Sequence, residues 1–267
     1  MLIEKIQTLE KLPDHQRFEQ IVQWLHEIGC PPKIQQYSTG KNIILPSTKS
    51  YKIGIGSHFD TVPNCPGAND NASAIVVCHA LAELYKNDPL DNLGVEFFFF
   101  DEEERGLVGS HAYLKKFGLN GLRGFLNLEL VGMGNQFAIW PVDHNHDGRL
   151  LNAFERTCSA SGIGYGRYDQ VIMNTADHES FRDVGLEDSF TITCISNKDV
   201  EVAYHYYRAM EFEVDSKTLY EIIQEAPLFQ HYHQPSDKSE HLTEECLSMT
   251  VSTIWETLKM LDRRVSV

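Results

Sequence analysis

Hydrophobic residues recur at two spacings along the first half of the chain, and the two spacings alternate. Continuous apolar runs of strand length lie at 51–57, at 94–100 (GVEFFFF) and at 124–132. Runs with helical spacing lie between them, at 73–85 and 106–117. These periods distinguish buried strands from helices. Their alternation predicts a mostly parallel sheet with helices on both faces.

The remaining segments extend the same architecture. The predicted elements are two helices over 2–29 separated near Pro13, short strands at 33–37 and 42–45, a helix at 148–161, a strand at 188–196 and a last helix over 243–262. Segment 197–230, rich in Tyr, Glu and Phe, fits least well and is expected to form a helical excursion over the sheet edge, a candidate lid. Because no repeat or linker interrupts the pattern, residues 1–267 are expected to form a single three-layer α/β/α domain.

The charge balance narrows the classes of partner. The chain carries a net charge of −15 at pH 7, which argues against nucleic acid or an anionic membrane as the main partner. No apolar run reaches the length of a signal peptide or a membrane span. The six cysteines include no CxxC pair, so reduced thiols and a cytoplasmic location are expected.

Reactive side chains gather where predicted strands end, the edge at which open α/β sheets bind ligands. The candidates are His58, Asp60, Asp70, the acidic run 101–104, Glu129 near the end of its strand, His233 and Asp237. Histidine with several carboxylates suits zinc or a similar divalent ion. Two such ions bridged by a carboxylate would compensate the consecutive acids. Since Asp60 follows His58 by two residues in an extended segment, we expect it to hold the imidazole from behind.

Five blocks carry a resemblance to a known family. They are HFD (58–60), PGANDNAS (66–73), EERGLVGS (103–110), ADHESF (176–181) and YHQPSD (232–237). In this order they resemble the di-zinc aminopeptidases of the bacterial secreted type. Their wider family, the MH-clan metallopeptidases, includes glutamate carboxypeptidase II and glutaminyl cyclase. The resemblance implies the zinc-aminopeptidase (phosphorylase/hydrolase-like) fold without an inserted dimerisation domain, and a small peptide or aminoacyl substrate.

The resemblance also implies a ligand set for two divalent metal ions, with zinc expected. His58 and Glu129 would complete one site, Glu104 and His233 would complete the other, and Asp70 would bridge both ions. The peptide bond after the bridging Asp is often cis in the family. One departure is Glu129, because the aminopeptidases usually have Asp there. Its extra methylene would either be absorbed by the backbone or loosen one site.

By the same resemblance, Glu103 would be the general base that takes a proton from the attacking water. Asp177, His178 and Tyr232 are candidate substrate contacts, although a structural role explains His178 equally well. The HNH run at 144–146 lies in a Gly- and Asp-rich turn and predicts a surface loop.

Hydrolytic removal of N-terminal residues is the expected reaction, and three alternatives stay open at this point. One is a non-catalytic binding module that keeps the fold, which is disfavoured because no ligand or base position has been lost. A glutaminyl-cyclase-like transferase would share the fold and the ligands but use one zinc ion. A deacylase or carboxypeptidase acting on N-acyl amino acids would need a cation for the substrate carboxylate. The candidates for that cation are Arg105, Arg167 and Arg182.

Overall fold

The computed structural model describes residues 1–169 and 175–265. The helices are α1 (Leu2–Leu9), α2 (Asp14–Glu27), α3 (Ser73–Asn87), α4 (Val108–Phe117), α5 (Arg149–Ser161), α6 (His178–Asp183), α7 (Asn197–Glu211), α8 (Ser216–Ile223) and α9 (Glu244–Val265). The strands are β1 (Lys33–Gln36), β2 (Lys41–Leu45), β3 (Lys52–His58), β4 (Gly94–Phe100), β5 (Leu122–Leu128), β6 (Gln136–Trp140), β7 (Gly164–Arg167) and β8 (Ser189–Ile195). Among the described residues, no helix is both long and apolar enough to span a membrane.

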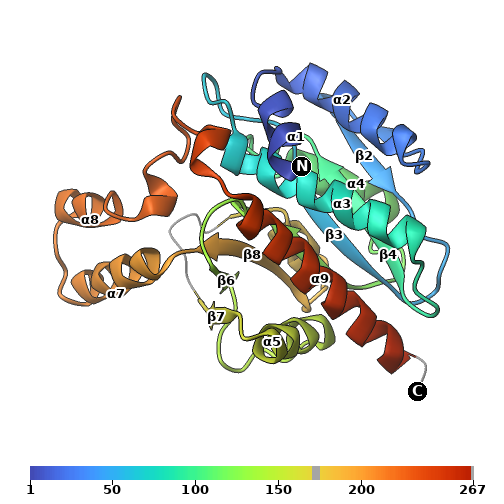
Figure 1. The fold of residues 1–267 in the computed structure, drawn as a ribbon. Helices are drawn as coiled ribbons and strands as arrows, with labels where there is room; N and C mark the ends of the chain where they lie inside the picture. The colour runs from blue at the N-terminus through green and yellow to red at the C-terminus, as the bar shows by residue number, and fades with distance from the viewer. Residues whose placement is uncertain (170–174, 266–267) are drawn as a thin grey trace.

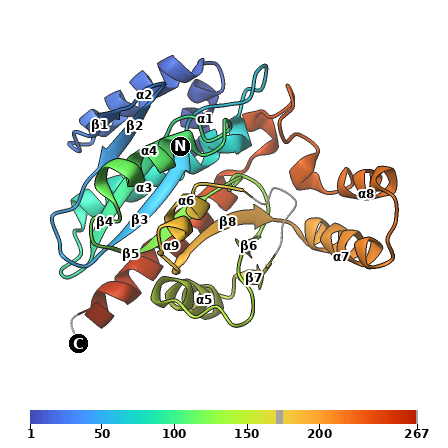
Figure 2. The same ribbon diagram turned by 180° about the vertical axis from the view of Figure 1, so that it is seen from behind.

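The described strands form one mixed, mostly parallel sheet, as predicted. Its order is β1-β2-β4-β3-β5-β8-β6-β7, and the central strands β4, β3, β5 and β8 run parallel. Helices α1, α2, α3, α5 and α9 share one core on the first face (Figure 1). Helices α4 and α6 cover the second face (Figure 2). The chain therefore has the three-layer α/β/α architecture expected from its pattern.

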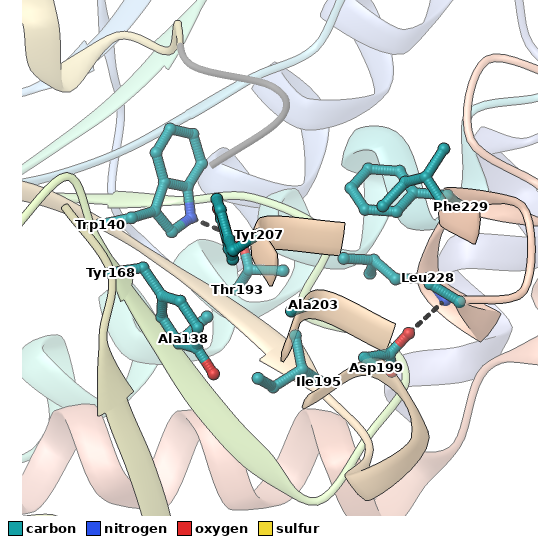
Figure 3. Close-up of a pocket in the computed structure, with 12 residues that line it drawn as sticks. Ala138, Trp140, Tyr168, Thr193, Ile195, Asp199, Ala203, Tyr207, Leu228 and Phe229 are labelled. Carbon is teal, nitrogen blue, oxygen red and sulfur yellow. Dashed lines mark hydrogen bonds between the residues drawn. The ribbon is translucent and has the colours of Figure 1, made fainter. Parts of the chain in front are cut away.

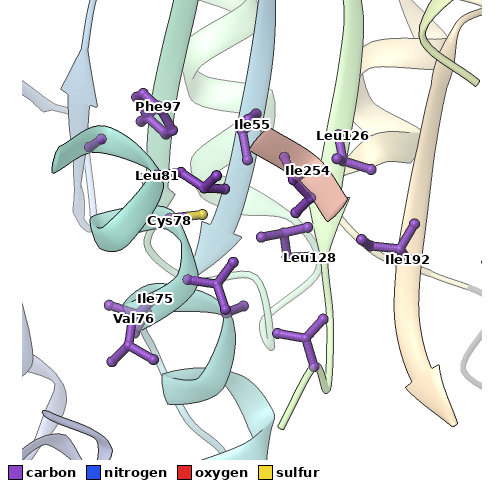
Figure 4. Packing of buried hydrophobic residues seen from close by; sticks show 14 of the residues in the cluster. Ile55, Ile75, Val76, Cys78, Leu81, Phe97, Leu126, Leu128, Ile192 and Ile254 are labelled. Atoms are coloured by element: carbon purple, nitrogen blue, oxygen red, sulfur yellow. The ribbon is translucent and has the colours of Figure 1, made fainter. Parts of the chain in front are cut away.

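Alternating side chains of β4 connect the two layers. Phe97 and Phe99 belong to the core beneath α3 and α9, where residues of β3, β5 and β8 meet those of both helices (Figure 4). Phe98 and Phe100 point to the other face, as a period of two requires. On that face the ring of Phe125 lies across β3, and a Cβ at Gly56 would meet it at 2.5 Å. Glycine at this position thus lets the ring cover the strand that ends at His58.

Two differences from the sequence prediction are clear. Strand β5 ends at Leu128, so Glu129 follows the strand instead of lying within it. The cause is local, because Leu130 adopts a left-handed φ of 55°, which extended pairing does not allow. Strands β6 and β7 and helix α6 were not predicted. Segment 197–230 does contain the expected helical excursion, and α7 and α8 project from the body of the molecule (Figure 1).

Candidate metal centre

The carboxyl ends of three neighbouring parallel strands bring the predicted residues together. His58 is the last residue of β3, the acidic run 101–104 follows β4, and Glu129 follows β5. Asp70 comes from a short helical turn, Ala68–Ala72, that leads into α3. His233 comes from the loop that precedes α9. Segments far apart in sequence therefore converge on the edge where ligands bind in open α/β sheets.

Asp70 lies between the two histidines. Its Oδ1 is 3.2 Å from Nε2 of His58, and its Oδ2 is 3.1 Å from Nε2 of His233. Glu129 approaches the first histidine, with Oε2 at 3.3 Å from Nε2. Glu104 approaches the second, also with Oε2 at 3.3 Å from Nε2. The result is two groups of three possible ligands that share Asp70, and a third group joins His58 to Glu103 and Glu104.

These residues fit divalent metal ions. Nε2 of His233 is buried and makes no hydrogen bond, although it faces two carboxylates. A buried polar atom without a partner is costly, and a cation between the ring and the carboxylates would satisfy it. Each group offers one imidazole nitrogen and two carboxylates, a donor set that zinc accepts.

The pKa shifts of the two histidines also fit a site for cations. Burial alone would lower the pKa of His58, but Glu129 and Glu103 raise it well above its ordinary value. Burial also opposes protonation of His233, and Asp70 and Glu104 nevertheless raise its pKa to about 10. The carboxylates thus favour positive charge at both imidazoles. Binding of a metal would supply this charge with a divalent cation in place of protons.

Asp60 supports the centre through one predicted contact, to His58, and two further contacts that the sequence did not predict. Its main-chain carbonyl oxygen lies 3.1 Å from Nδ1 of His58, so Asp60 lies behind the ring as the spacing predicts. Its carboxylate oxygens accept hydrogen bonds from the backbone amides of Glu103 (3.0 Å) and Glu104 (3.1 Å). One residue therefore orients both a histidine and the two acids. Such supporting contacts fix ligand geometry around metals.

Further supporting contacts come from Asp237, which was a candidate from the sequence, and from Asn71 and Asn127, which sequence reasoning missed. The carboxylate of Asp237 accepts hydrogen bonds from the backbone amides of Asn69 (2.8 Å) and Asp70 (3.0 Å). The side-chain amide of Asn71 donates to Oε2 of Glu129 at 2.7 Å, and that of Asn127 donates to Oε1 at 3.0 Å. The peptide bond between Asp70 and Asn71 is cis, as expected. Asn71 lies in the PGANDNAS block and Asp237 in the YHQPSD block, so both belong to blocks that the sequence had singled out.

The family model described as peptidase family M28 matches residues 42–258. The chain belongs to peptidase family M28. This membership confirms the resemblance drawn from the five sequence blocks. Among curated relatives of the M28 chain, aminopeptidase YwaD of Bacillus subtilis (strain 168) is 29% identical over 177 residues. The aligned part covers 62% of this chain and 39% of the relative, so the chain spans less than half the length of that protein.

Solved structures share the fold of the M28 chain at lower identity. A leucine aminopeptidase precursor from Bacteroides thetaiotaomicron matches with a TM-score of 0.71 and 16% identity, over 97% of this chain and 95% of that chain. A glutaminyl cyclase from the same organism matches with a TM-score of 0.68 and 17% identity, and the match covers 97% of this chain and 96% of the cyclase. Both proteins carry the α/β fold described above, and at such identities the likeness shows the fold alone.

A narrow cleft of the M28 chain exposes Glu103 beside the possible ligands. Oε2 of Glu103 lies 4.0 Å from Nε2 of His58. Burial raises the pKa of Glu103 well above its ordinary value, and the nearby Glu129 and Asp177 raise it further. Tyr232 lines the same cleft with its ring stacked on His233, the centroids 3.8 Å apart. Glu103 and Tyr232 therefore both face the cleft.

Asp177 and His178 lie behind the cleft and do not line it. Burial raises the pKa of Asp177 to about 7. His178 Nδ1 lies 2.7 Å from the Thr191 hydroxyl, and its ring meets the edge of Trp140 at 5.3 Å. Burial lowers the pKa of His178 to about 3, so the imidazole is neutral at pH 7. These contacts favour the structural interpretation of His178.

An apolar cavity of about 60 Å³ adjoins the cleft of the M28 chain. Trp140 lines both the cleft and the cavity. Ala203 and Tyr207 of α7 form one wall, and Leu228 closes another (Figure 3). The helical excursion after β8 thus contributes to this cavity. Asp199, the only acid on its wall among the described residues, is already bonded to the Leu228 amide at 2.9 Å.

Proposed function

We propose that the chain is a two-zinc aminopeptidase that hydrolyses the first peptide bond of small peptides. The supporting observation is the position of Asp70, whose two carboxylate oxygens face different histidines at 3.2 Å and 3.1 Å. His58 and Glu129 would hold one ion, His233 and Glu104 the other, and Asp70 both. Bound zinc would supply a water of lowered pKa and polarise the carbonyl group of the substrate.

Glu103 is the proposed general base. It accepts a proton at its carboxylate from the attacking water and then donates it to the leaving amine. Its raised pKa suits both steps, because a general base works best when its pKa lies near the working pH. The surplus of carboxylates around the cleft attracts the free α-amine of a peptide. The O–H of Tyr232, whose pKa burial and the carboxylates raise well above its ordinary value, stays available as a hydrogen-bond donor to the substrate.

The geometry disfavours the deacylase and leaves the cyclase to experiment. Two ligand groups share Asp70 and fit two ions, and because a one-zinc cyclase would use the same ligands, the number of zinc ions bound separates these two reactions. A deacylase needs a free cation near the cleft, and no Lys or Arg is among the described residues that line it. The three candidate arginines bond elsewhere: Arg105 to Glu102, Arg167 to Glu155, and Arg182 to the Ser189 carbonyl oxygen.

The apolar cavity is the proposed pocket for the first side chain of the substrate. Its walls are almost entirely apolar, and it shares Trp140 with the cleft. A cavity of roughly 150 Å³ accommodates a benzene ring, so about 60 Å³ suits a smaller group. Aliphatic N-terminal residues are therefore preferred over aromatic ones.

The Glu103→Gln variant tests this proposal. With a leucyl or alanyl chromogenic amide and added zinc, kcat should fall by about 10²–10⁴-fold, the usual contribution of general acid–base catalysis. Zinc content should stay at the wild-type level, because Glu103 is not a proposed ligand. Glu102→Gln is the matched control, since Glu102 lies in the same acidic run but bonds Thr39 and Arg105. Near-normal turnover by E103Q would remove Glu103 from the mechanism. Cyclisation of N-terminal Gln peptides without hydrolysis would favour the cyclase.

A further inference from the structure

Arg17 is a buried cation that the proposed reaction does not use. It lies on α2, and its residue is only 1% exposed. Its Nε donates to the carbonyl oxygen of Leu12 at 3.2 Å, and its Nη2 donates to the carbonyl oxygen of Pro66. Burial of a guanidinium is costly unless its bonds and charge are compensated. The contact with Pro66 shows which segment benefits, since Pro66 lies four residues before Asp70.

The segment from Pro66 to Asp70 is held from two sides. On one side the guanidinium lies against the backbone of Gly67, where a Cβ would be 3.2 Å from Nη1 of Arg17. On the other side the carboxylate of Asp237 accepts from the backbone amide of Asp70 at 3.0 Å. Gly67 has a φ of +59°, which favours glycine at this close approach.

A second contact attaches α2 to the start of the same loop. The hydroxyl of Thr61 donates to Oδ1 of Asp14 at 3.0 Å. Asp14 and Arg17 stand one helical turn apart, so α2 presents both groups to the loop. The loop between His58 and Asp70 is therefore docked on α2 at Thr61 and again at Pro66.

We propose that Arg17 is a positioning residue for the metal centre, which holds the Pro66–Asp70 segment so that both oxygens of Asp70 face the two ion sites. This role rests on the proposed two-zinc function. Arg17 acts by fixing the position of Asp70, which strengthens zinc binding, whereas its positive charge by itself would repel zinc and weaken binding. Because these two effects change zinc affinity in opposite directions, replacement of Arg17 shows which one dominates.

The test is zinc affinity of the metal-free protein, measured by competition with a chromogenic chelator. Arg17→Met and Arg17→Lys should both weaken binding of both ions by about 10–100-fold, the usual effect of removing a group that supports metal ligands. Lysine keeps the charge, but its single nitrogen replaces two separate donors of Arg17, Nε to Leu12 and Nη2 to Pro66. Excess zinc should restore the peptidase activity of both variants. Unchanged or tighter zinc binding by R17M, or wild-type affinity in R17K, would overturn the proposal.

Two controls keep the result specific. The first control is Trp24→Leu. Trp24 lies two turns further along α2 and packs on His79, so its replacement destabilises α2 at a place away from the loop. The zinc affinity of this variant should match the wild type, and a loss like that of R17K would contradict a specific role for Arg17. If the wild type binds two zinc ions but cleaves no peptide, the aminopeptidase proposal fails while the affinity comparison still decides the role of Arg17. If the wild type binds no zinc, both proposals are contradicted.

Discussion

Glu129→Asp is the most informative single change, because it introduces the residue that the resembling aminopeptidases usually have. In this chain the longer side chain is held at both oxygens, by Asn71 at 2.7 Å and Asn127 at 3.0 Å. Its Oε2 lies 3.3 Å from Nε2 of His58. The surrounding amides are thus arranged for glutamate, and we expect aspartate to bind metal worse here.

The magnitude follows from the geometry. Removal of one methylene withdraws the carboxylate by up to about 1.5 Å, one C–C bond. Zinc–oxygen bonds are about 2.0–2.2 Å long, so such a shift takes the oxygen out of reach. Loss of about 10–100-fold in affinity for one ion is expected, which corresponds to about 1.4–2.7 kcal/mol. Asn71 still donates to the Leu128 carbonyl oxygen at 2.9 Å, so the fold should persist.

Isothermal titration of the metal-free protein with zinc provides the assay. The wild type should show two equivalents, and E129D should keep one at wild-type affinity and weaken the other. Glu96→Asp is the matched control, because Glu96 is equally buried but pairs with Lys52 at 2.6 Å away from the centre. Two equivalents at unchanged affinity in E129D would refute the assignment of Glu129 as a ligand.

Two other changes test the surroundings of the centre. The pKa of His178 is about 3 in the folded protein, against an ordinary value of 6.5. Between these values the unfolded chain binds a proton at His178 and the folded protein does not, so the free energy of unfolding decreases as pH falls from 6.5 towards 3. In urea unfolding, His178→Gln should therefore lose less stability on acidification, by about 1.4 kcal/mol per pH unit; an identical pH dependence would contradict this. Ala203→Phe should fill the apolar cavity and reduce kcat/KM for leucyl substrates more than for alanyl substrates, and an equal loss for both would exclude the cavity as the side-chain pocket.

Much of the fold was predictable because its central strands carry strong periodic signals. The GVEFFFF run is buried on both faces, so its hydrophobicity alone identified β4. Strands β6 and β7 are short, and β7 contains two glycines and an arginine, so no period is visible. Helix α6 is a six-residue helix, too short for a helical pattern to emerge.

The meeting of the proposed ligands at one edge of the sheet was predictable, because each of them follows a strand or lies in a recognisable block. Apart from Asp60 behind His58, the supporting contacts were not predicted, since most of them join residues far apart in sequence. Asp237 bonds the amide of Asp70 across 167 positions, and no local pattern reports such a pairing. Arg17 adjoins Phe18 at the margin of the apolar stripe of α2, where an arginine ordinarily faces solvent. Only the path of the loop through Pro66 shows why it is buried.

The central claim is that two ions act together in hydrolysis, and one titration tests it directly. Metal-free protein is reconstituted with increasing zinc, while bound metal and hydrolysis of a leucyl amide are measured in the same samples. Activity should rise until two equivalents per chain are bound, with one equivalent giving only a fraction of the final rate. Full hydrolytic activity at one equivalent, or no hydrolysis at two, would contradict the account.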